Sequence, residues 1–436
     1  MREQARPWPA GSSGPGRRLS AWPRRRVVVA LAALSCLIGY TDRTNIGVAA
    51  VAMARDLGWS DTQKGLVLSS FFVGYMLMMP LTGWLATRFG GALILGLSGV
   101  LWSVFTLLTP AAAALPLPYL IAARVGMGIG ESAMFPAAYE LFGRWVPAAE
   151  RARAIARLLS GVPLGTIAGL AATGWIITRY GWPTSFYLAG CVGLVWAAVW
   201  FWQVRDDPAR DARLSAEERR LLPAGGQPAA LERATPWRRL LLRVPVFGIV
   251  VGHFALTWNL YVLLSWLPSY FHKVHGVGIA SAGILSAAPW LAMFAVTNVA
   301  AAVSDRLIAR GVSVTAVRKL MQCTGLGVPA VCLLLLRDVS SPEVATALIC
   351  VAAGALGCCW CGSSPSMLDV APRHGGIVSG VVNGIATIPG IVGVSLTGWL
   401  VDVTGTYAAA FVLTAAVGIV GALVFAAFFD ARPLVD

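Results

Sequence analysis

Residues 27–51 read VVVALAALSCLIGYTDRTNIGVAAV, and this run decides the class of fold. About twenty mostly apolar residues are enough for an α-helix to cross the ~30 Å hydrocarbon core of a bilayer. Asp42 and Arg43 nevertheless lie side by side within it. A charged side chain at the centre of a bilayer costs at least ~2.5–3.5 kcal/mol, so such residues usually face a polar cavity and have a function. We therefore expect either an ion or substrate path at this pair, or a structural ion pair that holds the first helix to a neighbour.

The composition extends this interpretation to the whole chain of 436 residues, of which 57% are hydrophobic and 12% are charged. Soluble domains carry about 25% charged residues, so the sequence predicts an all-α protein that crosses the membrane many times. Apolar runs long enough to span a bilayer occur twelve times. They lie at about 27–51, 63–87, 91–110, 117–144, 154–178, 184–204, 244–271, 278–304, 317–336, 343–367, 375–401 and 406–429.

A polar stretch at 205–243 separates these runs into two groups of six. We expect an N-terminal six-helix bundle at 27–204, a central cytoplasmic loop at 205–243 and a C-terminal six-helix bundle at 244–430. Residues 1–26 are rich in arginine, and we expect a disordered cytoplasmic tail there. The apolar run that follows is too long for the core of a cleaved signal peptide.

The net charge of +14 is typical of proteins that bind nucleic acids, but the positions of the charges give another explanation. When loops are assigned alternately to two sides, most Lys and Arg residues collect on the side that holds both termini. The positive-inside rule then places both termini in the cytoplasm, and no nucleic-acid partner is expected. Arg43 and Arg124 fall within the membrane, and the opposite side holds only Arg55, Lys64, Arg179, Lys273 and Arg337.

A short repeat relates the two halves of the chain. Residues 173–181 read TGWIITRYG and residues 397–405 read TGWLVDVTG. They end the fifth and the eleventh predicted helices, which are equivalent positions in two six-helix halves. Duplicated halves around a site at the middle of the membrane are an arrangement that transporters use.

The cysteines do not indicate a metal site. Cys358, Cys359 and Cys361 lie in an apolar run with no histidine or acid at ligand spacing nearby, so we expect packing residues. The sequence also lacks a constellation of nucleophile and base. We therefore expect no metal, no cofactor and no catalytic residue, which means that the protein is not an enzyme.

Residues 124–136 in the fourth run read RVGMGIGESAMFP and form a second charged cluster. Arg124 and Glu131 are seven positions apart, so they share one helical face at ~10 Å along the axis. The intervening glycines allow another helix to approach closely. Pro136 leaves a backbone carbonyl without its partner and can kink the helix.

The depths of the two charged clusters agree. Asp42 lies ~22 Å above the cytoplasmic end of its helix, and Arg124 lies ~10 Å below the outer end of a helix that runs the other way. In a ~30 Å core both come out ~20 Å from the inside, whereas Glu131 is about two turns nearer the cytoplasm. We expect a chain of charges along one aqueous path, with Arg124 between the two acids.

Two loops carry related motifs. Residues 83–91 read GWLATRFGG, and residues 300–307 read AAAVSDRL. Both resemble the cytoplasmic Gly-x-x-x-Asp-Arg-x-Gly signature of the major facilitator superfamily, in which an acid and a base brace helix ends while the transporter faces outward. The first copy has Thr87 in place of the acid, and the second lacks the leading glycine. We expect a cytoplasmic gate at Gly83, Arg88, Asp305 and Arg306.

The pattern Tyr-x-Asp-Arg-x-Asn at 40–45, followed by Arg-x-x-x-Gly-x-Gly-Glu at 124–131, resembles the anion:cation symporter family of that superfamily. The family includes bacterial sugar-acid permeases, animal vesicular and lysosomal organic-anion carriers, and plant plastid phosphate and ascorbate transporters. The resemblance covers nearly the whole chain, including SWLPSY at 265–270. It implies a major facilitator fold of twelve transmembrane helices in two six-helix bundles, which rock about a midplane cavity.

The resemblance also implies roles for individual residues. Guanidinium groups match carboxylates and phosphates, so the two buried arginines would bind the anion while the two acids carry protons. The charged residues could instead form purely structural ion pairs. Tyr75 could serve only in packing, and Asn383 could serve only in hydrogen bonding between helices. The implied proton carriers are Asp42 and Glu131, and the implied substrate ligands are Tyr40, Arg43, Tyr75, Arg124 and Asn383.

Two other polar residues in the predicted spans have simpler interpretations. Glu140 precedes Arg144 by one helical turn, which favours a salt bridge at the cytoplasmic end. His253 is expected to be packed and hydrogen-bonded rather than to carry protons.

We therefore predict a secondary transporter that takes up an organic anion, such as a sugar acid, together with protons. The expected setting is a monomer in the inner membrane of a bacterium, with a small anion, protons and the lipid bilayer as its partners. The alternative is a carrier of phosphate or another inorganic anion, with sodium as a candidate coupling ion. A drug/proton antiporter is disfavoured because 161–165 lacks the Gly-x-x-x-Gly-Pro signature, and a non-transporting sensor because the charges are intact.

Overall fold

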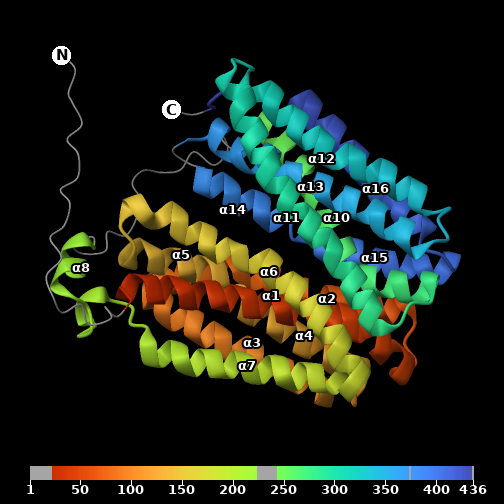
Figure 1. Ribbon diagram of the computed structural model, residues 1–436, viewed down its shortest axis with the longest axis horizontal. Helices are drawn as coiled ribbons and strands as arrows, with labels where there is room; N and C mark the ends of the chain where they lie inside the picture. The colour runs from red at the N-terminus through yellow and green to blue at the C-terminus, as the bar shows by residue number, and fades with distance from the viewer. Residues whose placement is uncertain (1–21, 223–242, 373–374, 435–436) are drawn as a thin grey trace, which may run out of the picture.

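The computed structural model describes residues 22–222, 243–372 and 375–434, and it contains helices and no strand within these ranges. The first half of the chain forms one bundle, which is red to yellow-green in Figure 1. Its helices are α1 (Arg24–Leu57), α2 (Asp61–Phe89), α3 (Gly91–Ala113), α4 (Leu117–Glu131), α5 (Met134–Trp145), α6 (Ala148–Tyr180) and α7 (Trp182–Gln203).

The second half forms a second bundle, green to blue in Figure 1, which lies across the first. A short 3-10 turn, η1 (Pro208–Arg210), and the helix α8 (Ala216–Leu221) lie between the two bundles in sequence. The helices of the second bundle are α10 (Val244–His275), α11 (Ile279–Ala309), α12 (Val314–Leu336), α13 (Pro342–Val370), α14 (Gly375–Ile385), α15 (Ile388–Thr404) and α16 (Ala408–Phe428).

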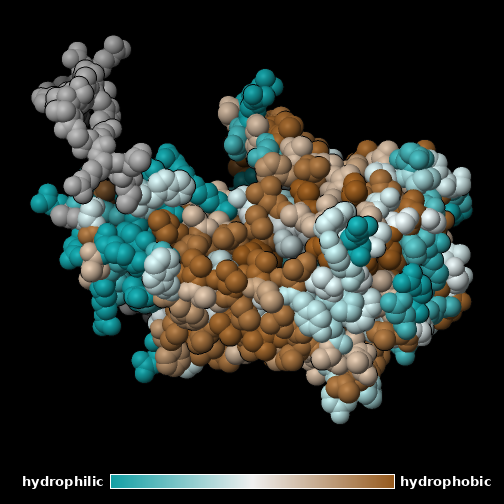
Figure 2. All heavy atoms as spheres, turned by 60° about the horizontal axis from the view of Figure 1, so that its bottom comes forward, coloured by the Kyte–Doolittle hydropathy of each residue, from teal (hydrophilic) through white to brown (hydrophobic). Residues whose placement is uncertain are grey.

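The described residues include eleven helices that are long and apolar enough to cross a membrane. The predicted fourth span, 117–144, is covered by α4 and α5 together, and each of these is too short to cross alone. Figure 2 shows the matching surface, a broad apolar belt between polar caps at the two ends of the molecule. The all-α, multi-pass architecture predicted from the sequence is confirmed. We call the end of the molecule at which α1 begins and α16 ends the terminal end, and the other end of the molecule the opposite end.

The fourth and eleventh spans are broken rather than continuous, and proline explains both breaks. Pro136 is the third residue of α5, so the carbonyl of Ser132 has no backbone donor one turn later. That carbonyl accepts a hydrogen bond from Thr82 Oγ1 at 3.3 Å instead. In the other bundle Pro389 is the second residue of α15, which begins after the break that follows Ile385. Glu131 and Asn383 therefore lie close to equivalent breaks in the two bundles.

The two bundles contact each other mainly through α2 with α15, α6 with α11, and α1 with α10. The repeated motif lies at these contacts, because Gly174 of α6 packs on the backbone of Ile279 and Gly398 of α15 packs on the backbone of Asp61. A Cβ atom at Gly398 would overlap the Asp61 carbonyl oxygen. The shared glycine of the two TGW segments thus permits close approach of the bundles at the opposite end.

Ion pairs across the same contact hold the opposite end closed. Asp61 binds Lys64 in its own helix at 2.8 Å and Lys273 of α10 at 2.5 Å. Asp402 of α15 accepts hydrogen bonds from the backbone N–H groups of Asp61 at 2.8 Å and Thr62 at 2.6 Å, and so caps α2 from the other bundle. All four groups lie where the sequence predicts the non-cytoplasmic side.

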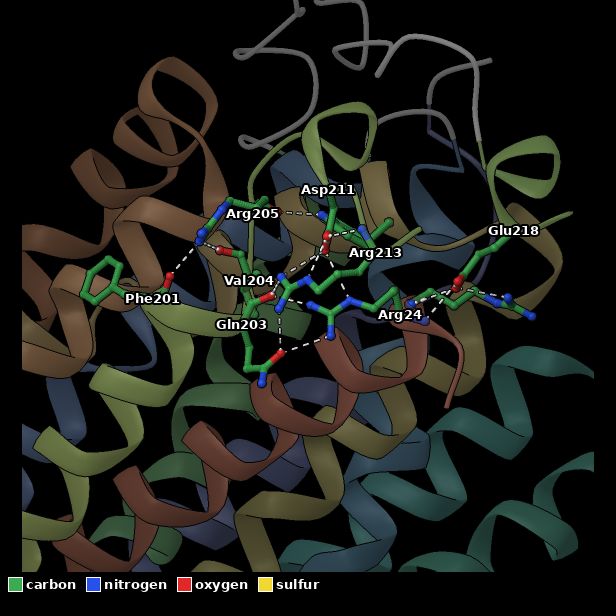
Figure 3. A network of polar contacts seen from close by, with 10 residues as sticks. Arg24, Phe201, Gln203, Val204, Arg205, Asp211, Arg213 and Glu218 are labelled. Atoms are coloured by element: carbon green, nitrogen blue, oxygen red, sulfur yellow. Dashed lines mark hydrogen bonds and ion pairs between the residues drawn. The ribbon is translucent and has the colours of Figure 1, made fainter. Parts of the chain in front are cut away.

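At the terminal end, the start of the central loop packs against the start of α1 (Figure 3). Arg24 donates to Asp211 at 3.2 Å and to Gln203 Oε1 at 3.1 Å. Glu218 of α8 accepts from the backbone N–H groups of Arg24 at 2.9 Å and Arg25 at 2.8 Å. This capping explains why α1 begins at Arg24 rather than at 27. The described part of the central loop is folded onto the bundle.

Asp211 keeps its charge in this network. Its burial acts to raise the pKa, but hydrogen bonds from Arg213 and the charge of Arg24 hold the pKa below the usual aspartate value. Most of the tail predicted to be disordered, residues 1–21, lies outside the described residues, as do residues 223–242 of the predicted central loop.

Candidate functional site

The first charged cluster is an ion pair between α1 and α4. Arg43 donates to the same oxygen of Glu131 twice, from Nε at 3.0 Å and from Nη2 at 2.6 Å. Both side chains are nearly inaccessible, with 6% and 0% of their surface exposed. Glu131 Oε1 is buried without a hydrogen-bond partner among the described residues. The sequence predicted the meeting of these helices but placed Arg124, not Arg43, against Glu131.

Asp42 turns away from this pair toward α3. It accepts a short hydrogen bond from the hydroxyl of Thr106, and it is 1% exposed. Its other oxygen, Oδ1, has no partner in the described structure. Adjacent residues on a helix point ~100° apart, which is why Asp42 and Arg43 face different neighbours.

Arg124 is the most unusual group in the membrane-spanning region. It is 1% exposed, yet no Asp or Glu of the described chain forms an ion pair with it. Its Nη1 contacts the sulfur of Met127 at 2.8 Å, and its Nε has no partner. Asp42 and Glu131 lie close enough to act on its charge, but neither bonds to it directly. A buried charge that lacks a directly bonded partner is costly. The free Nε of Arg124 is therefore a donor that an anionic ligand would satisfy.

A small cavity lies between the two arginines. It is walled mainly by helices of the first bundle, with α10 of the second bundle closing one side, and its water-accessible volume is about 10 Å³, which is room for about one water molecule. The site is therefore contracted in this conformation. The lining residues are Arg43, Ile46, Gly47, Leu68, Phe71, Phe72, Arg124, Leu264 and Ser265.

Aromatic rings surround the Arg43 guanidinium. Its central carbon lies 4.6 Å from the ring centres of Tyr40 and Phe71 and 5.1 Å from that of Tyr75. The Phe71 ring centre also lies 5.6 Å from the central carbon of Arg124, so one ring neighbours both cations. Electron-rich ring faces stabilise guanidinium groups at this range. The structure thus gathers Tyr40 and Tyr75 around the arginine with which the sequence grouped them.

Asn383 lies in a separate polar cluster within the second bundle. Its Oδ1 is 3.3 Å from His253 Nε2, and the other ring nitrogen of His253 is 2.9 Å from Ser363 Oγ. Asn383 also donates to the backbone carbonyl of Ser379 at 2.8 Å. It does not contact Arg43 or Arg124 in this conformation. The prediction that His253 is packed and hydrogen-bonded is confirmed.

The predicted gate residues are not engaged with one another. Arg88, Asp305 and Arg306 are exposed, and none of them forms an ion pair within the described residues. Gly83 has open space around its Cα, and Thr87 donates to the backbone carbonyl of Trp84 at 2.8 Å.

Other residues form the ion pairs at the terminal end. Arg144 binds Asp206 at 2.6 Å and Glu140 at 3.0 Å, so the predicted salt bridge is confirmed. In the second bundle Arg318 binds Asp369 at 2.9 Å.

Sequence reasoning missed three residues that the geometry brings to the site. Thr106 was one of several hydroxyl residues in an apolar run, and no pattern distinguished it. Ser265 belonged to a segment of the family resemblance and Phe71 to the apolar run 63–87, but nothing in their spacing showed that they face the arginines. Among the described residues no group of three or more His, Cys, Asp and Glu side chains is arranged to hold a metal ion.

Comparison with known proteins agrees with this geometry. The family profile of the Major Facilitator Superfamily matches residues 32–394. A protein of Oryza sativa subsp. japonica named probable anion transporter 4, chloroplastic, is 36% identical over 97% of this chain and 72% of its own length. The ascorbate transporter, chloroplastic, of Arabidopsis thaliana is 35% identical over 95% of this chain and 76% of its own.

A third relative is the sodium-dependent phosphate transport protein 1, chloroplastic, of Arabidopsis thaliana. It is 34% identical over 95% of this chain and 81% of its own length. Solved structures share the fold. A bacterial homologue of the human lysosomal transporter Spinster, in an inward-facing conformation, has a TM-score of 0.73 at 20% identity and covers 94% of this chain and 97% of its own.

A D-xylose–proton symporter has a TM-score of 0.75 at 14% identity and covers 94% of this chain and all of its own. The similarity to these two solved structures concerns the fold alone. The rice anion transporter and the Arabidopsis ascorbate transporter, by contrast, are more than one third identical over nearly the full chain. The family profile, the relatives and the multi-span architecture agree: the chain is a multi-pass membrane transporter, not an enzyme, and belongs to the major facilitator superfamily, in which its relatives are anion transporters.

Proposed function

We propose that this transporter carries a small organic anion, with Arg43 and Arg124 as the ligands of its negatively charged group. The observation that carries the proposal is Arg124, a buried guanidinium with no acidic partner that lines the midplane cavity. A carboxylate placed between the arginines would supply the missing charge and accept hydrogen bonds from both. The hydroxyls of Tyr40 and Tyr75 would donate to the same substrate.

Glu131 couples the anion to a proton. In the observed state its carboxylate occupies the donors of Arg43. A proton on Glu131 removes that charge and frees Arg43 for the substrate, so protonation and anion binding favour each other. Asp42, which is buried against Thr106, is the second proton carrier. Symport follows because the charges of the site are better balanced when the proton and the anion are both bound than when only one of them is bound.

The orientation of the chain follows from its charges. The distribution of Lys and Arg supports a cytoplasmic location for both termini, and we propose the inner membrane of a bacterium. The structure is then closed toward the outside by Asp61, Lys273 and Asp402. The 27–204 and 244–430 bundles would rock about the midplane as a monomer. Arg88, Asp305 and Arg306 would brace the cytoplasmic side when it closes in turn.

Uptake into proteoliposomes tests this function. Vesicles that contain the full chain receive radiolabelled sugar acid, ascorbate or inorganic phosphate, under an inward pH gradient, an inward sodium gradient or neither. We expect a pH gradient to drive accumulation of at least one carboxylate, and a protonophore to abolish it. If no gradient drives accumulation of any of these anions, the symporter proposal is wrong.

Phosphate transport driven by sodium is the second candidate. It is favoured by the 34% identity over 95% of this chain to a protein named as a sodium-dependent phosphate transporter. Two arginines also suit a phosphate. Accumulation of phosphate under a sodium gradient, with no response of carboxylates to the pH gradient, would replace the first proposal by this one.

A further inference from the structure

A second, strongly basic pocket lies at the terminal end of the first bundle, between the start of α1 and the start of α6. Arg25 and Arg26 of α1 form one side, and Arg153 and Arg157 of α6 form the other. The water-accessible volume is about 70 Å³, several times that of the midplane cavity. The pocket is therefore already large enough for a group of several atoms.

The charges in this pocket do not balance. Glu150 is the only acid in its lining, and it binds Arg25 at 3.1 Å. Arg25 in turn is mostly buried and also binds Glu218 at 3.2 Å, so it is fixed and neutralised. Arg26, Arg153 and Arg157 form no ion pair with any described residue, and all three are exposed. Arg26, Arg153 and Arg157 thus line one concave site without a direct ion pair, and Glu150 alone offsets part of their charge.

The floor of the pocket distinguishes it from an ordinary charged surface. Val29 and Ala154 are buried beneath the arginines, so part of the lining is apolar and partly shielded from water. Charge-assisted hydrogen bonds gain strength where water is partly excluded. Arg25 precedes Arg43 by eighteen residues, or ~27 Å of helix, so the pocket is separate from the midplane site.

We propose that this pocket binds one phosphate- or carboxylate-bearing anion, held by Arg26, Arg153 and Arg157. Guanidinium groups arranged around a common point match the several acceptor oxygens of such a group. The same chemistry is offered by a soluble anion and by the headgroup of an anionic phospholipid, because the site lies at the charged start of α1, directly before its apolar run. The proposal does not require the midplane site to bind an anion.

Phosphate binding to the full chain tests the pocket directly. The protein is placed in nanodiscs of phosphatidylcholine, and the binding of radiolabelled inorganic phosphate is measured in an Arg43→Gln/Arg124→Gln background, which removes the midplane ligands. We expect binding to persist there. Adding Arg153→Gln and Arg157→Gln should weaken it roughly tenfold or more, since two of three charge-assisted ligands are lost.

Two further variants separate a site from general attraction. Arg219→Gln/Arg220→Gln removes the same charge from exposed positions of α8 and should leave binding nearly unchanged. Arg153→Lys/Arg157→Lys keeps the charge and should retain part of the binding. If the α8 variant weakens binding as much as the pocket variant, or if no phosphate binds in the background protein, the pocket is not a site.

Nanodiscs that contain phosphatidylglycerol identify the source of the anion. A phospholipid headgroup that competes for the pocket makes phosphate bind more weakly in these discs than in phosphatidylcholine discs. Such weakening, if it requires Arg153 and Arg157, would assign the pocket to a phospholipid headgroup. Unchanged phosphate binding would assign it to a soluble anion. Both outcomes retain an anion site, and the midplane function is tested separately by transport.

Discussion

The two bundles share one fold but differ at the middle of the membrane. The first holds four charged residues there, in two contacts: Arg43 with Glu131, and Asp42 with Thr106, while Arg124 has no acidic partner. The second holds a cluster of neutral groups in its interior, where His253, Ser363 and Asn383 are hydrogen-bonded. Within the described residues, the charged residues of α10 to α16 all lie near helix ends.

This difference separates two tasks. Buried charges are costly, but they bind an ion strongly and respond to protons. Neutral hydrogen-bonding groups contribute about 0.5–1.5 kcal/mol each and recognise the shape and hydroxyl pattern of a ligand. We infer that the first bundle supplies anion binding and coupling, whereas the second supplies selectivity among anions.

Arg124→Gln should produce the largest effect. It removes the buried charge that has no partner except the proposed substrate, and loss of one member of such a contact costs about 2–5 kcal/mol. We expect uptake in proteoliposomes to fall at least ~30-fold, with the protein still monodisperse on size exclusion. Arg310→Gln, at an exposed position, is the matched control and should retain full uptake. Normal uptake by Arg124→Gln would remove the anion role from the first bundle.

Asp42→Asn should separate coupling from binding. An amide keeps the shape and can still bond to Thr106, but it cannot carry a proton. We expect loss of accumulation under a pH gradient, while exchange of internal for external substrate continues at a substantial fraction of the wild-type rate. Counterflow and gradient-driven uptake measured on the same vesicles check this. Concentrative uptake at the wild-type level would exclude Asp42 as a proton carrier.

Asn383→Ala should have a moderate effect in the second bundle. It removes one neutral hydrogen-bonding side chain, so we expect KM to rise roughly two- to tenfold. The ratio of protons to substrate should stay the same. A panel of acids that differ in hydroxyl number would reveal altered preference. A changed coupling ratio, measured by reversal potential, would contradict the division of tasks between the bundles.

Thr87→Asp should have the smallest effect, because it lies on an exposed helix end. The substitution makes the first gate more like the second, in which Asp305 precedes Arg306. An exposed pair contributes about 0–1 kcal/mol, so we expect the uptake rate to change by less than about fivefold. Thr87→Asn serves as the uncharged control. Equal effects of both variants would show that charge is not the cause.

Much of this architecture follows from the sequence because bilayer thickness imposes a strict length on apolar runs. The same rule predicted a common depth for Asp42 and Arg124, whose charges act on each other in the structure without a direct contact. It could not give the pairing of Arg43 with Glu131, because a helical position fixes a Cα atom while a long side chain reaches across a turn or more. Thr106 escaped notice since hydroxyls in membrane helices usually bond to their own backbone, and its single O–H is shared between Asp42 and the backbone carbonyl of Trp102.

The small size of the midplane cavity has a consequence for hydration. With room for about one water molecule, the observed state is the dehydrated form of the site, and any state that admits an anion must take up additional water. Osmotic stress from a solute too large to enter would oppose that uptake. A transport rate that falls as a large polyethylene glycol is added, at constant viscosity, would then count the water molecules that enter with each opening.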